Sequence, residues 1–265
     1  MSELITSRDN KIVKYVSRLL SSTKSRRGSF EFVIEGARLC LDAVLSSTEI
    51  VLLLYTKKAK IKYSEQFEKI SKCANNSYVV SDEIMEYLSD TQSPQGILCI
   101  CKMVDRKAEL DRINNNGKFI ALENVQDPSN MGTILRTAEA LGINGIIISK
   151  DSCDIYNPKV LRGSMGAVFR IPIFIAENIA EKIAELNKNG FTSYASVPNR
   201  GVTNVNKTSF KAGSIIAIGN EGNGLATDTI NVCTRTITIP MPGRAESLNA
   251  ATAASIMMWE MVRGE

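Results

Sequence analysis

Apolar residues recur at helical spacing near the start of the chain. Positions 12, 13, 16, 19 and 20 are apolar and basic residues lie mostly between them, which predicts an amphipathic helix. The polar stretch SSTKSRRGS at residues 21–29 is expected to be a loop. Short apolar runs then alternate with amphipathic segments, which favours a small α/β domain. Its expected strands are residues 30–34, 50–55, 77–80 and 96–103, and its expected helices are residues 37–46, 64–71 and 81–88.

A polar stretch separates this domain from a second one. Residues 104–117 end in Asn-Asn-Asn-Gly, and we interpret them as a linker with one short helix. Apolar runs at residues 119–122, 145–149, 192–195, 215–218 and 237–239 predict strands, and residues 130–141, 158–163, 180–189 and 249–262 predict helices. Strands joined by helices indicate a parallel sheet covered on both faces. The expected domains are therefore residues 1–104 and 118–265, joined by residues 105–117.

Composition restricts the class of protein. The chain has 265 residues, of which 44% are hydrophobic, and this is enough for two cores. No apolar run approaches the roughly 20 residues of a membrane helix, and the N-terminus does not resemble a signal peptide. We therefore expect a cytoplasmic protein that does not contact a membrane.

The chain contains no histidine, so histidine cannot serve as a metal ligand, a general base or a member of a catalytic triad. The six cysteines form no Cys-x-x-Cys pair, so no metal site is expected. Cys99 and Cys101 alternate in an apolar run and are predicted to point to the same side of a strand. Reduced core cysteines are favoured over a redox or metal role.

Charge is concentrated at the N-terminal end. Between Arg8 and Arg27 seven residues are basic and only Asp9 is acidic, whereas the whole chain carries a net charge of only +4. This end is suited to contact with an anion such as a nucleic acid. A solvated helix face followed by a loop explains the same charges equally well.

Two turns rich in glycine and small polar residues follow the strands at 215–218 and 237–239, and each is expected to lead into a helix. The turns read GNEGNG at residues 219–224 and PMPG at residues 240–243. Glycine lets main-chain N–H and C=O groups approach a small polar ligand, although the first turn alone is equally compatible with a plain loop. Its spacing G-x-x-G-x-G differs from the dinucleotide fingerprint, and no P-loop motif occurs. A Rossmann dehydrogenase and a P-loop enzyme are therefore disfavoured.

The helix at residues 130–141 carries an arginine with an unusual setting. Pro128 supplies a fixed φ before it, and Asn130 is the expected helix cap. Arg136 lies between Leu135 and Ala138, close to the apolar face. An arginine in that position requires an anionic partner, either a carboxylate inside the protein or a phosphate outside it.

Four successive segments resemble the motifs of one family. DPSNMGTILRTAEALG, NPKVLRGSMGAVFRIPI, IGNEGNGL and IPMPGRAESLNAATAASI are similar, in this order over residues 124–256, to the motifs of the SpoU (TrmH-type) RNA ribose 2′-O-methyltransferases of the SPOUT superfamily. FVIEGARLCLDAVL and LSDTQSPQGILCICK resemble the small L30e-like substrate-binding domain that precedes the catalytic domain in many members. The resemblance implies an α/β protein whose C-terminal parallel sheet contains a deep trefoil knot, and it implies a homodimer.

The implied activity is transfer of a methyl group from S-adenosyl-L-methionine to a ribose 2′-OH of RNA. Ribosomal RNA, in particular 23S rRNA, is favoured over tRNA, because the L30e-like extension is common among members that act on large-subunit rRNA. A tRNA methyltransferase and a catalytically silent RNA-binding homologue are the alternatives. A dehydrogenase-like or other nucleotide enzyme is a third alternative, from another class.

The resemblance also implies roles for individual residues. The cofactor contacts are Gly219, Ile239, Met241, Gly243 and Leu248. The catalytic residues are Asn130, Arg136, Glu221, Ser247 and Asn249. Arg136 is expected to bind the target phosphate of the RNA and orient the hydroxyl. Further RNA contacts are expected from Lys24, Arg26 and Arg27, on the charge of the basic N-terminal segment and not on the resemblance. The alternative for Glu221 is a structural role in fixing its turn, and the alternative for Asn130 is that of a helix cap. Residues 250–252 read Ala-Ala-Thr, where the family commonly has Val-Ser-Val.

Overall fold

A computed structural model describes residues 4–91, 93–103, 113, 116–199 and 201–263. The chain forms two compact units, the first made of Met1–Val104 with Asp154–Phe169 and the second of Asp105–Cys153 with Arg170–Glu265. Most of the predicted linker at residues 105–117, with its short helix, lies outside the described residues, and the predicted domain boundaries stay a prediction. None of the helices in the described part of the chain is long and apolar enough to span a bilayer.

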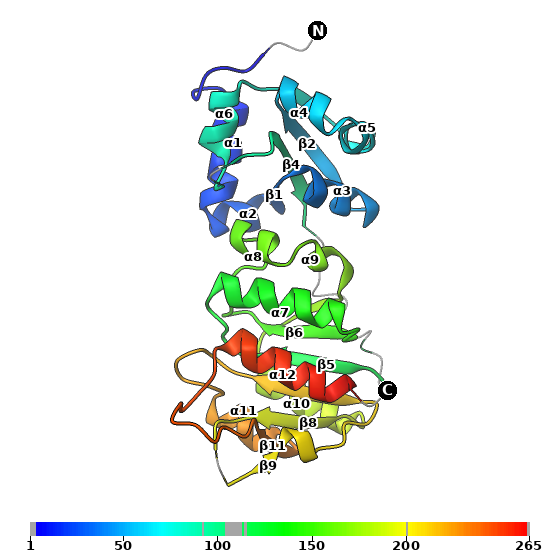
Figure 1. Cartoon of the computed structure of the whole chain (residues 1–265), viewed down its shortest axis with the longest axis vertical. Helices are drawn as coiled ribbons and strands as arrows, with labels where there is room; N and C mark the ends of the chain where they lie inside the picture. Colours follow the sequence, from blue (N-terminus) through cyan, green and yellow to red (C-terminus); the bar gives the residue numbers. More distant parts are fainter. Residues whose placement is uncertain (1–3, 92, 104–112, 114–115, 200, 264–265) are drawn as a thin grey trace. The chain divides into compact units, whose positions relative to one another are not determined.

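The first unit contains a four-stranded sheet in the order β1-β4-β2-β3. β4 pairs antiparallel with β1 and β2, and β3 pairs parallel with β2. The strands are β1 (Glu31–Glu35), β2 (Ile50–Tyr55), β3 (Ser77–Val79) and β4 (Ile97–Lys102). The helices are α1 (Lys11–Ser21), α2 (Thr23–Ser29), α3 (Ala37–Leu45), α4 (Lys57–Lys62), α5 (Ser64–Cys73), α6 (Asp82–Leu88), α8 (Pro158–Gly163) and α9 (Ala167–Arg170). Helices α1 and α6 cover one face of this sheet, and α3, α4 and α5 cover the other (Figure 1).

Strand β4 is buried on both faces because its residues alternate between two layers. Leu98 and Ile100 pack in the cluster formed with α1 and α6. Cys99 and Cys101 alternate with these two residues and are not members of that cluster, which confirms that they point to the same side, the side covered by α3 with its buried Cys40. Burial raises the pKa of all three thiols, so they remain protonated core side chains.

The predicted loop at residues 21–29 is wrong, because most of this stretch forms helix α2. Ser22 caps the helix by accepting a hydrogen bond from Ser25 N (3.1 Å). The short helix α4 was not predicted either, and it begins at a comparable cap in which Thr56 Oγ1 accepts from Ala59 N (3.1 Å). In both places a hydroxyl side chain supplies a start signal that the strongly basic composition concealed.

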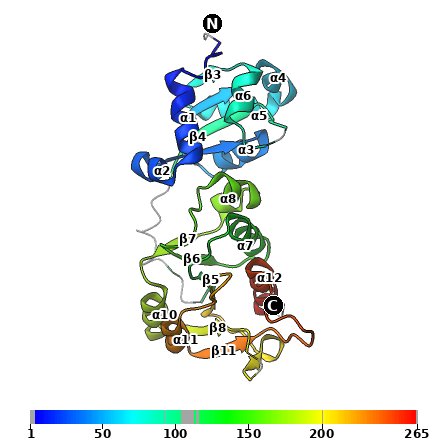
Figure 2. The same cartoon turned by 90° about the vertical axis from the view of Figure 1, so that its left-hand side faces the viewer.

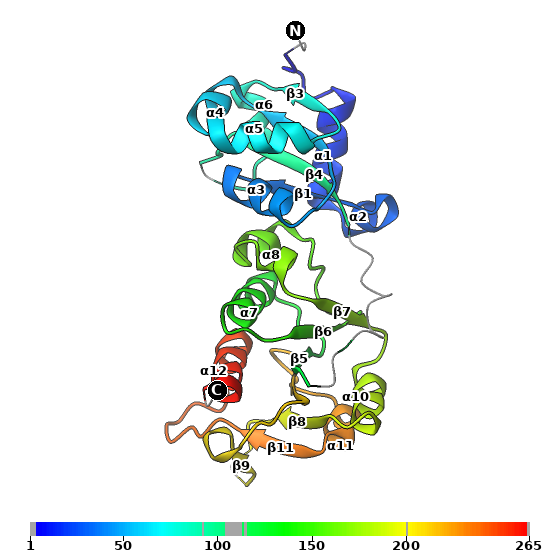
Figure 3. The same cartoon turned by 90° about the vertical axis from the view of Figure 1, so that its right-hand side faces the viewer.

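The second unit contains a seven-stranded sheet in the order β7-β6-β5-β10-β8-β11-β9, and every described pairing in it is parallel. Helices α7 and α12 lie on one face, and α10 and α11 lie on the other (Figures 2 and 3). The strands are β5 (Lys118–Leu122), β6 (Gly145–Ser149), β7 (Ile173–Ala176), β8 (Thr192–Ser196), β9 (Thr203–Asn204), β10 (Ser214–Ile218) and β11 (Arg235–Thr238). The helices are α7 (Pro128–Ala140), α10 (Ile179–Lys188), α11 (Thr227–Val232) and α12 (Ala250–Val262), with a 3₁₀ turn η2 at Val205–Lys207.

The predicted parallel sheet with helices on both faces is confirmed. Strands β7 and β9 were not predicted. The sequence around β7 shows no alternation of apolar and polar residues, and β9 has only two residues. The trefoil knot stays a prediction.

The start of α7 differs from the prediction in a way that matters for the site. Pro128 occupies the first turn, and the cap is Asp127, whose side chain accepts a hydrogen bond from Ser129 N (2.6 Å). Asn130 lies inside the first turn and is therefore not the cap. Its amide is left to bond with other parts of the chain.

Candidate active site

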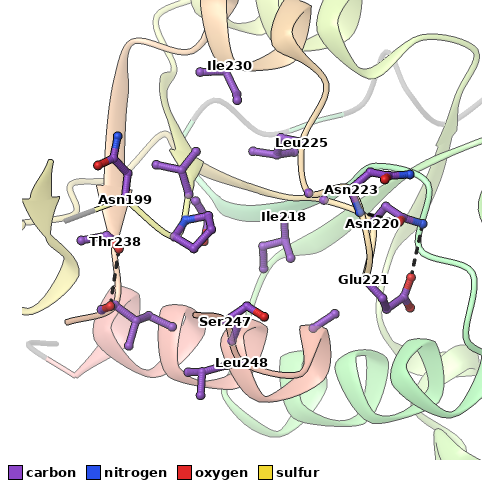
Figure 4. A pocket seen from close by; sticks show the side chains of 18 of the residues that line it. Asn199, Ile218, Asn220, Glu221, Asn223, Leu225, Ile230, Thr238, Ser247 and Leu248 are labelled. Carbon is purple, nitrogen blue, oxygen red and sulfur yellow. Dashed lines mark hydrogen bonds between the residues drawn. The ribbon is translucent and has the colours of Figure 1, made fainter. Parts of the chain in front are cut away.

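A cavity of about 520 Å³ opens where three neighbouring parallel strands end. Its walls come from the carboxyl ends of β8, β10 and β11 and from the turns that follow them (Figure 4). This volume lies within the range of roughly 300–1,000 Å³ that is typical of sites for small molecules. The carboxyl edge of a parallel sheet is also where such sites occur in α/β proteins.

The cavity lining is mostly apolar and almost uncharged. Figure 4 shows Asn199 and Thr238 on one side and Asn220 and Glu221 on the other, with Ile218 between them. Among the described residues that line the cavity, one carboxylate and no basic side chain occur. An apolar ring system with polar edges suits such walls, whereas a pyrophosphate would meet no cation there.

The turn after β10 can be built only with glycine at its first position. A Cβ atom on Gly219 would lie 2.1 Å from the carbonyl carbon of Gly224, so no side chain fits. Asn220 and Gly224 exchange two main-chain hydrogen bonds of 3.0 Å, and Asn220 Oδ1 accepts from Gly222 N (2.9 Å). The turn therefore closes on itself and presents its main chain to the cavity as a rigid rim.

The Glu221 carboxylate connects this rim to the start of α7. It accepts hydrogen bonds from the main-chain N–H groups of Gln126 and Asp127 (both 3.1 Å) and from Asn130 Nδ2 (3.0 Å). Partial burial alone would raise the pKa of Glu221, but the bonds from Asn130 and the two N–H groups outweigh it and hold this pKa below its usual value. Glu221 is therefore an anion at neutral pH.

Asn130 continues the network to α12. Its Oδ1 accepts a hydrogen bond from Asn249 Nδ2 (2.9 Å), and Asn249 Oδ1 caps α12 by accepting from Ala251 N (2.9 Å) and Thr252 N (3.2 Å). Each amide uses its donor end on one side and its acceptor end on the other, which fixes both orientations. Asn130 is only 7% exposed, so its position is also fixed by packing. Three predicted catalytic residues thus form one chain, Glu221–Asn130–Asn249.

The other predicted residues of this region are placed as follows. The cavity is lined by Gly219, Ile239, Met241, Ser247 and Leu248. Gly243 belongs to the same loop but is not among the lining residues.

Arg136 is not among the residues that line the cavity and does not belong to the hydrogen-bond chain Glu221–Asn130–Asn249. It lies on α7, six residues after Asn130, and its side chain is exposed. No ion pair or hydrogen bond of its guanidinium is found within the described part of the chain. The carboxylate partner that the sequence allowed is therefore absent among these residues, and the side chain is open to an anion from outside.

The prediction that Arg26 contacts RNA is wrong. Arg26 is 2% exposed, its Nε and Nη2 both lie 2.8 Å from Asp154 Oδ2, and its Nη1 donates to Leu19 O at 2.7 Å. This arginine anchors α2 inside the first unit. Lys24 and Arg27 lie on the outer side of the same helix and are exposed, so both remain candidates for an RNA contact.

Several lining residues were not predicted. Asn220 holds the turn together and stands inside the GNEGNG motif, so an Asx-turn signal was present in the sequence. Ile230 lies on α11, six residues after that motif. Asn199 comes from a segment far from the motif, and no local pattern marks it. Only the sheet order, which makes β8 a neighbour of β10 and β11, brings Asn199 to the cavity.

Comparison with sequence families gives two matches. The model of the SpoU rRNA Methylase family matches residues 117–259, and the model of the MRM3-like substrate binding domain matches residues 10–99. The first match covers the whole cavity and α7, and the second covers most of the first unit.

Individual proteins are similar over nearly the whole chain. The 23S rRNA (guanosine(2553)-2′-O)-methyltransferase RlmP of Bacillus subtilis is 27% identical over 98% of this chain and 99% of its own length. The 23S rRNA (uridine(2479)-2′-O)-methyltransferase of Streptomyces viridochromogenes is 29% identical over 98% of this chain and 91% of its own length. The crystal structure of an AdoMet-bound rRNA methyltransferase from Sinorhizobium meliloti superposes with a TM-score of 0.88 at 28% identity, covering 99% of this chain and 98% of that one.

Proposed function

Because the chain belongs to the SpoU rRNA methylase family, we propose that it transfers a methyl group from S-adenosylmethionine to a ribose 2′-OH of 23S rRNA. The observation that carries this proposal is the cavity at the ends of β8, β10 and β11, whose rim is hydrogen-bonded to α7, the helix that carries the exposed Arg136. The similar proteins of B. subtilis and S. viridochromogenes, named as 23S rRNA 2′-O-methyltransferases, support rRNA over tRNA as the substrate.

The residues of the cavity fit the cofactor. The main chain at Gly219 and the side chains of Ile239, Met241 and Leu248 would hold it, since all four residues line a mostly apolar cavity of sufficient volume. Gly243 stays a predicted contact from the same loop. When bound, S-adenosylmethionine supplies an electrophilic methyl group.

Arg136 is the residue proposed to bind the RNA at the reacting nucleotide. Its exposed guanidinium matches a phosphate in charge and in the geometry of its donors. A guanidinium has a pKa above roughly 12, so it does not act as a free base at neutral pH. Its proposed role is to grip the phosphate and thereby orient the 2′-OH.

The remaining polar residues are proposed to position the site. Glu221, Asn130 and Asn249 hold the β10 turn, α7 and α12 in register through hydrogen bonds of 2.9–3.0 Å. This arrangement keeps Arg136 at a fixed place relative to the cavity, because both belong to the elements that the network joins. Ser247 lines the cavity with an exposed hydroxyl, and we propose that it contacts the substrate.

The active form is proposed to be a homodimer, as the family resemblance implies. Trp259 on α12 is 55% exposed, and burying such a side chain against a second copy would favour association.

Transfer of tritium from labelled S-adenosylmethionine to an in vitro transcript of 23S rRNA tests the proposal. Wild-type protein should label the transcript at a ribose 2′-OH. Arg136→Ala should abolish labelling while cofactor affinity stays nearly unchanged, and Arg235→Ala, another exposed arginine of the second unit, should leave labelling unaffected. Near wild-type transfer by Arg136→Ala would show that its proposed role is wrong.

Other outcomes of this experiment point to the alternatives. Labelling of tRNA in place of the transcript would make tRNA the substrate. Cofactor binding without transfer to any cellular RNA would indicate a catalytically silent homologue. Tight binding of NAD in place of S-adenosylmethionine would indicate a nucleotide enzyme of another class.

A further inference from the structure

One aromatic residue of the first unit has an unfavourable backbone conformation and an unfavourable exposure at the same time. Phe30, directly after α2, has φ of +55° in the left-handed region, which bulky residues normally avoid. Its side chain is also 65% exposed. Glycine at this position would relieve both costs. Such a combination points to a function, since a ring that is mostly exposed contributes little to the core.

The main chain of Phe30 is held firmly. Its N–H donates to Arg26 O at the end of α2, and its carbonyl accepts from Met103 N (2.8 Å). The ring is therefore presented to solvent from a fixed backbone, which lowers the entropic cost of binding a partner.

The surroundings of Phe30 are positively charged. Lys24 and Arg27 on α2 are exposed, and no carboxylate partner of either is found among the described residues. The nearby acidic residues are already neutralised. Glu31 is 7% exposed and bonds to Lys102 Nζ (2.7 Å), and the carboxylate of Asp154 is paired with buried Arg26.

The basic surface continues on α1, which packs against α2. Lys11, Lys14 and Arg18 are exposed at positions three and four residues apart, so they share one face of that helix. Of these three, Lys14 is paired with Asp9 at 2.7 Å. The exposed ring thus directly follows two adjacent helices that carry exposed cations.

We propose that Phe30 stacks on an unpaired base of the RNA substrate, while Lys24 and Arg27 hold the adjacent phosphates. The inference rests on the proposed function, which makes RNA the substrate. An aromatic ring close in the chain to exposed cations matches an unstacked nucleotide, because the base has a π-face and the backbone carries the negative charge. A protein partner with an apolar patch would leave Lys24 and Arg27 without counterparts.

Binding of an in vitro 23S rRNA transcript to Phe30 variants tests this inference, together with thermal unfolding of each variant. Phe30→Gly should unfold at the same or a higher temperature than wild type, because the strain at φ +55° is removed. It should nevertheless bind the transcript about tenfold more weakly. Phe30→Trp should keep the affinity of wild type, and Phe30→Leu should lose as much as Phe30→Gly. Ile61→Ala, which truncates a side chain 79% exposed on α4, is the matched control and should bind normally.

The salt dependence separates stacking from charge. Arg27→Gln should flatten the plot of log Kd against log salt by roughly 0.7–0.9 of a slope unit per lost phosphate contact, whereas Phe30→Gly should leave the slope unchanged. Wild-type affinity in Phe30→Gly would overturn the inference and leave the proposed function standing. Full affinity in Phe30→Leu would replace stacking by simple apolar contact and also overturn it. If wild-type protein does not bind the transcript at all, the proposed 23S rRNA substrate fails with it.

Discussion

Replacement of Asn130 by alanine is expected to destabilise the second unit by a predictable amount. The change removes the hydrogen bond to the Glu221 carboxylate (3.0 Å) and the bond from Asn249 Nδ2 (2.9 Å). A bond to a charged group contributes about 1.5–3 kcal/mol, and a bond between neutral groups about 0.5–1.5 kcal/mol. Glu221 is exposed and keeps its two main-chain donors, so we expect the lower part of the sum, about 2 kcal/mol in the free energy of unfolding.

The destabilisation should depend on pH with a definite sign. The hydrogen bonds hold the pKa of Glu221 below its ordinary value of 4.5, so their contribution to stability is complete above that value. It is lost as the pH falls through the lower pKa of the folded protein. Without Asn130 this pKa moves back up, so the stability difference between wild type and Asn130→Ala should be largest at pH 7 and should narrow below pH 4.5.

Urea unfolding at pH 7 and at pH 4 measures this difference. The single tryptophan, Trp259, lies on α12, the helix that Asn249 caps, and its fluorescence reports on the end of the network directly. Asn130→Asp is the matched variant, because it keeps the shape but places a second carboxylate against Glu221. It should be less stable than Asn130→Ala at pH 7 and recover in acid. A difference below about 0.5 kcal/mol at pH 7, or one that does not change with pH, would refute the assigned network.

Two further pairs of substitutions each compare a position that the structure constrains with a neighbouring one that it does not. Arg26→Met should lower the free energy of unfolding by about 3–5 kcal/mol because it leaves the buried Asp154 carboxylate unpaired, whereas Arg27→Met should change it by less than about 0.5 kcal/mol in the same urea titration. Gly219→Ala should abolish binding of S-adenosylmethionine in calorimetry and lower the melting temperature, since its Cβ would lie 2.1–2.3 Å from main-chain atoms. Gly222→Ala in the same turn should be tolerated, because its Cβ meets only a side-chain oxygen at 3.5 Å.

Much of the fold could be predicted because its strands are short apolar runs with clear ends. The run at residues 50–55 became β2 with the same bounds, and Pro158 marks the start of α8 as predicted. The prediction for residues 21–29 failed because their composition is typical of a loop, whereas their helical conformation is stabilised by a buried ion pair of Arg26. The partner of Arg26 in this pair is Asp154, 128 residues away, and no local pattern contains this information.

The contacts between residues of the candidate site were likewise not predictable from local sequence patterns. Both glycine-rich turns could be found in the sequence, because each directly follows an apolar strand. That Glu221 reaches Asn130 across 91 residues, and Asn130 reaches Asn249 across 119, depends on the order of strands in the sheet. The sequence therefore indicated which polar residues belong to the site, but their mutual bonding required the fold.

This bonding divides the five predicted catalytic residues by what they can still do. Most polar side-chain atoms of Glu221, Asn130 and Asn249 form hydrogen bonds with one another or with main-chain N–H groups. A direct role of these residues in proton transfer would require breaking hydrogen bonds that hold the β10 turn, α7 and α12 together. Arg136 and Ser247 are exposed and are not members of this network. A substrate phosphate and ribose can therefore be met by these two without disturbing the scaffold, which favours alignment of the nucleotide over general-base catalysis by the carboxylate.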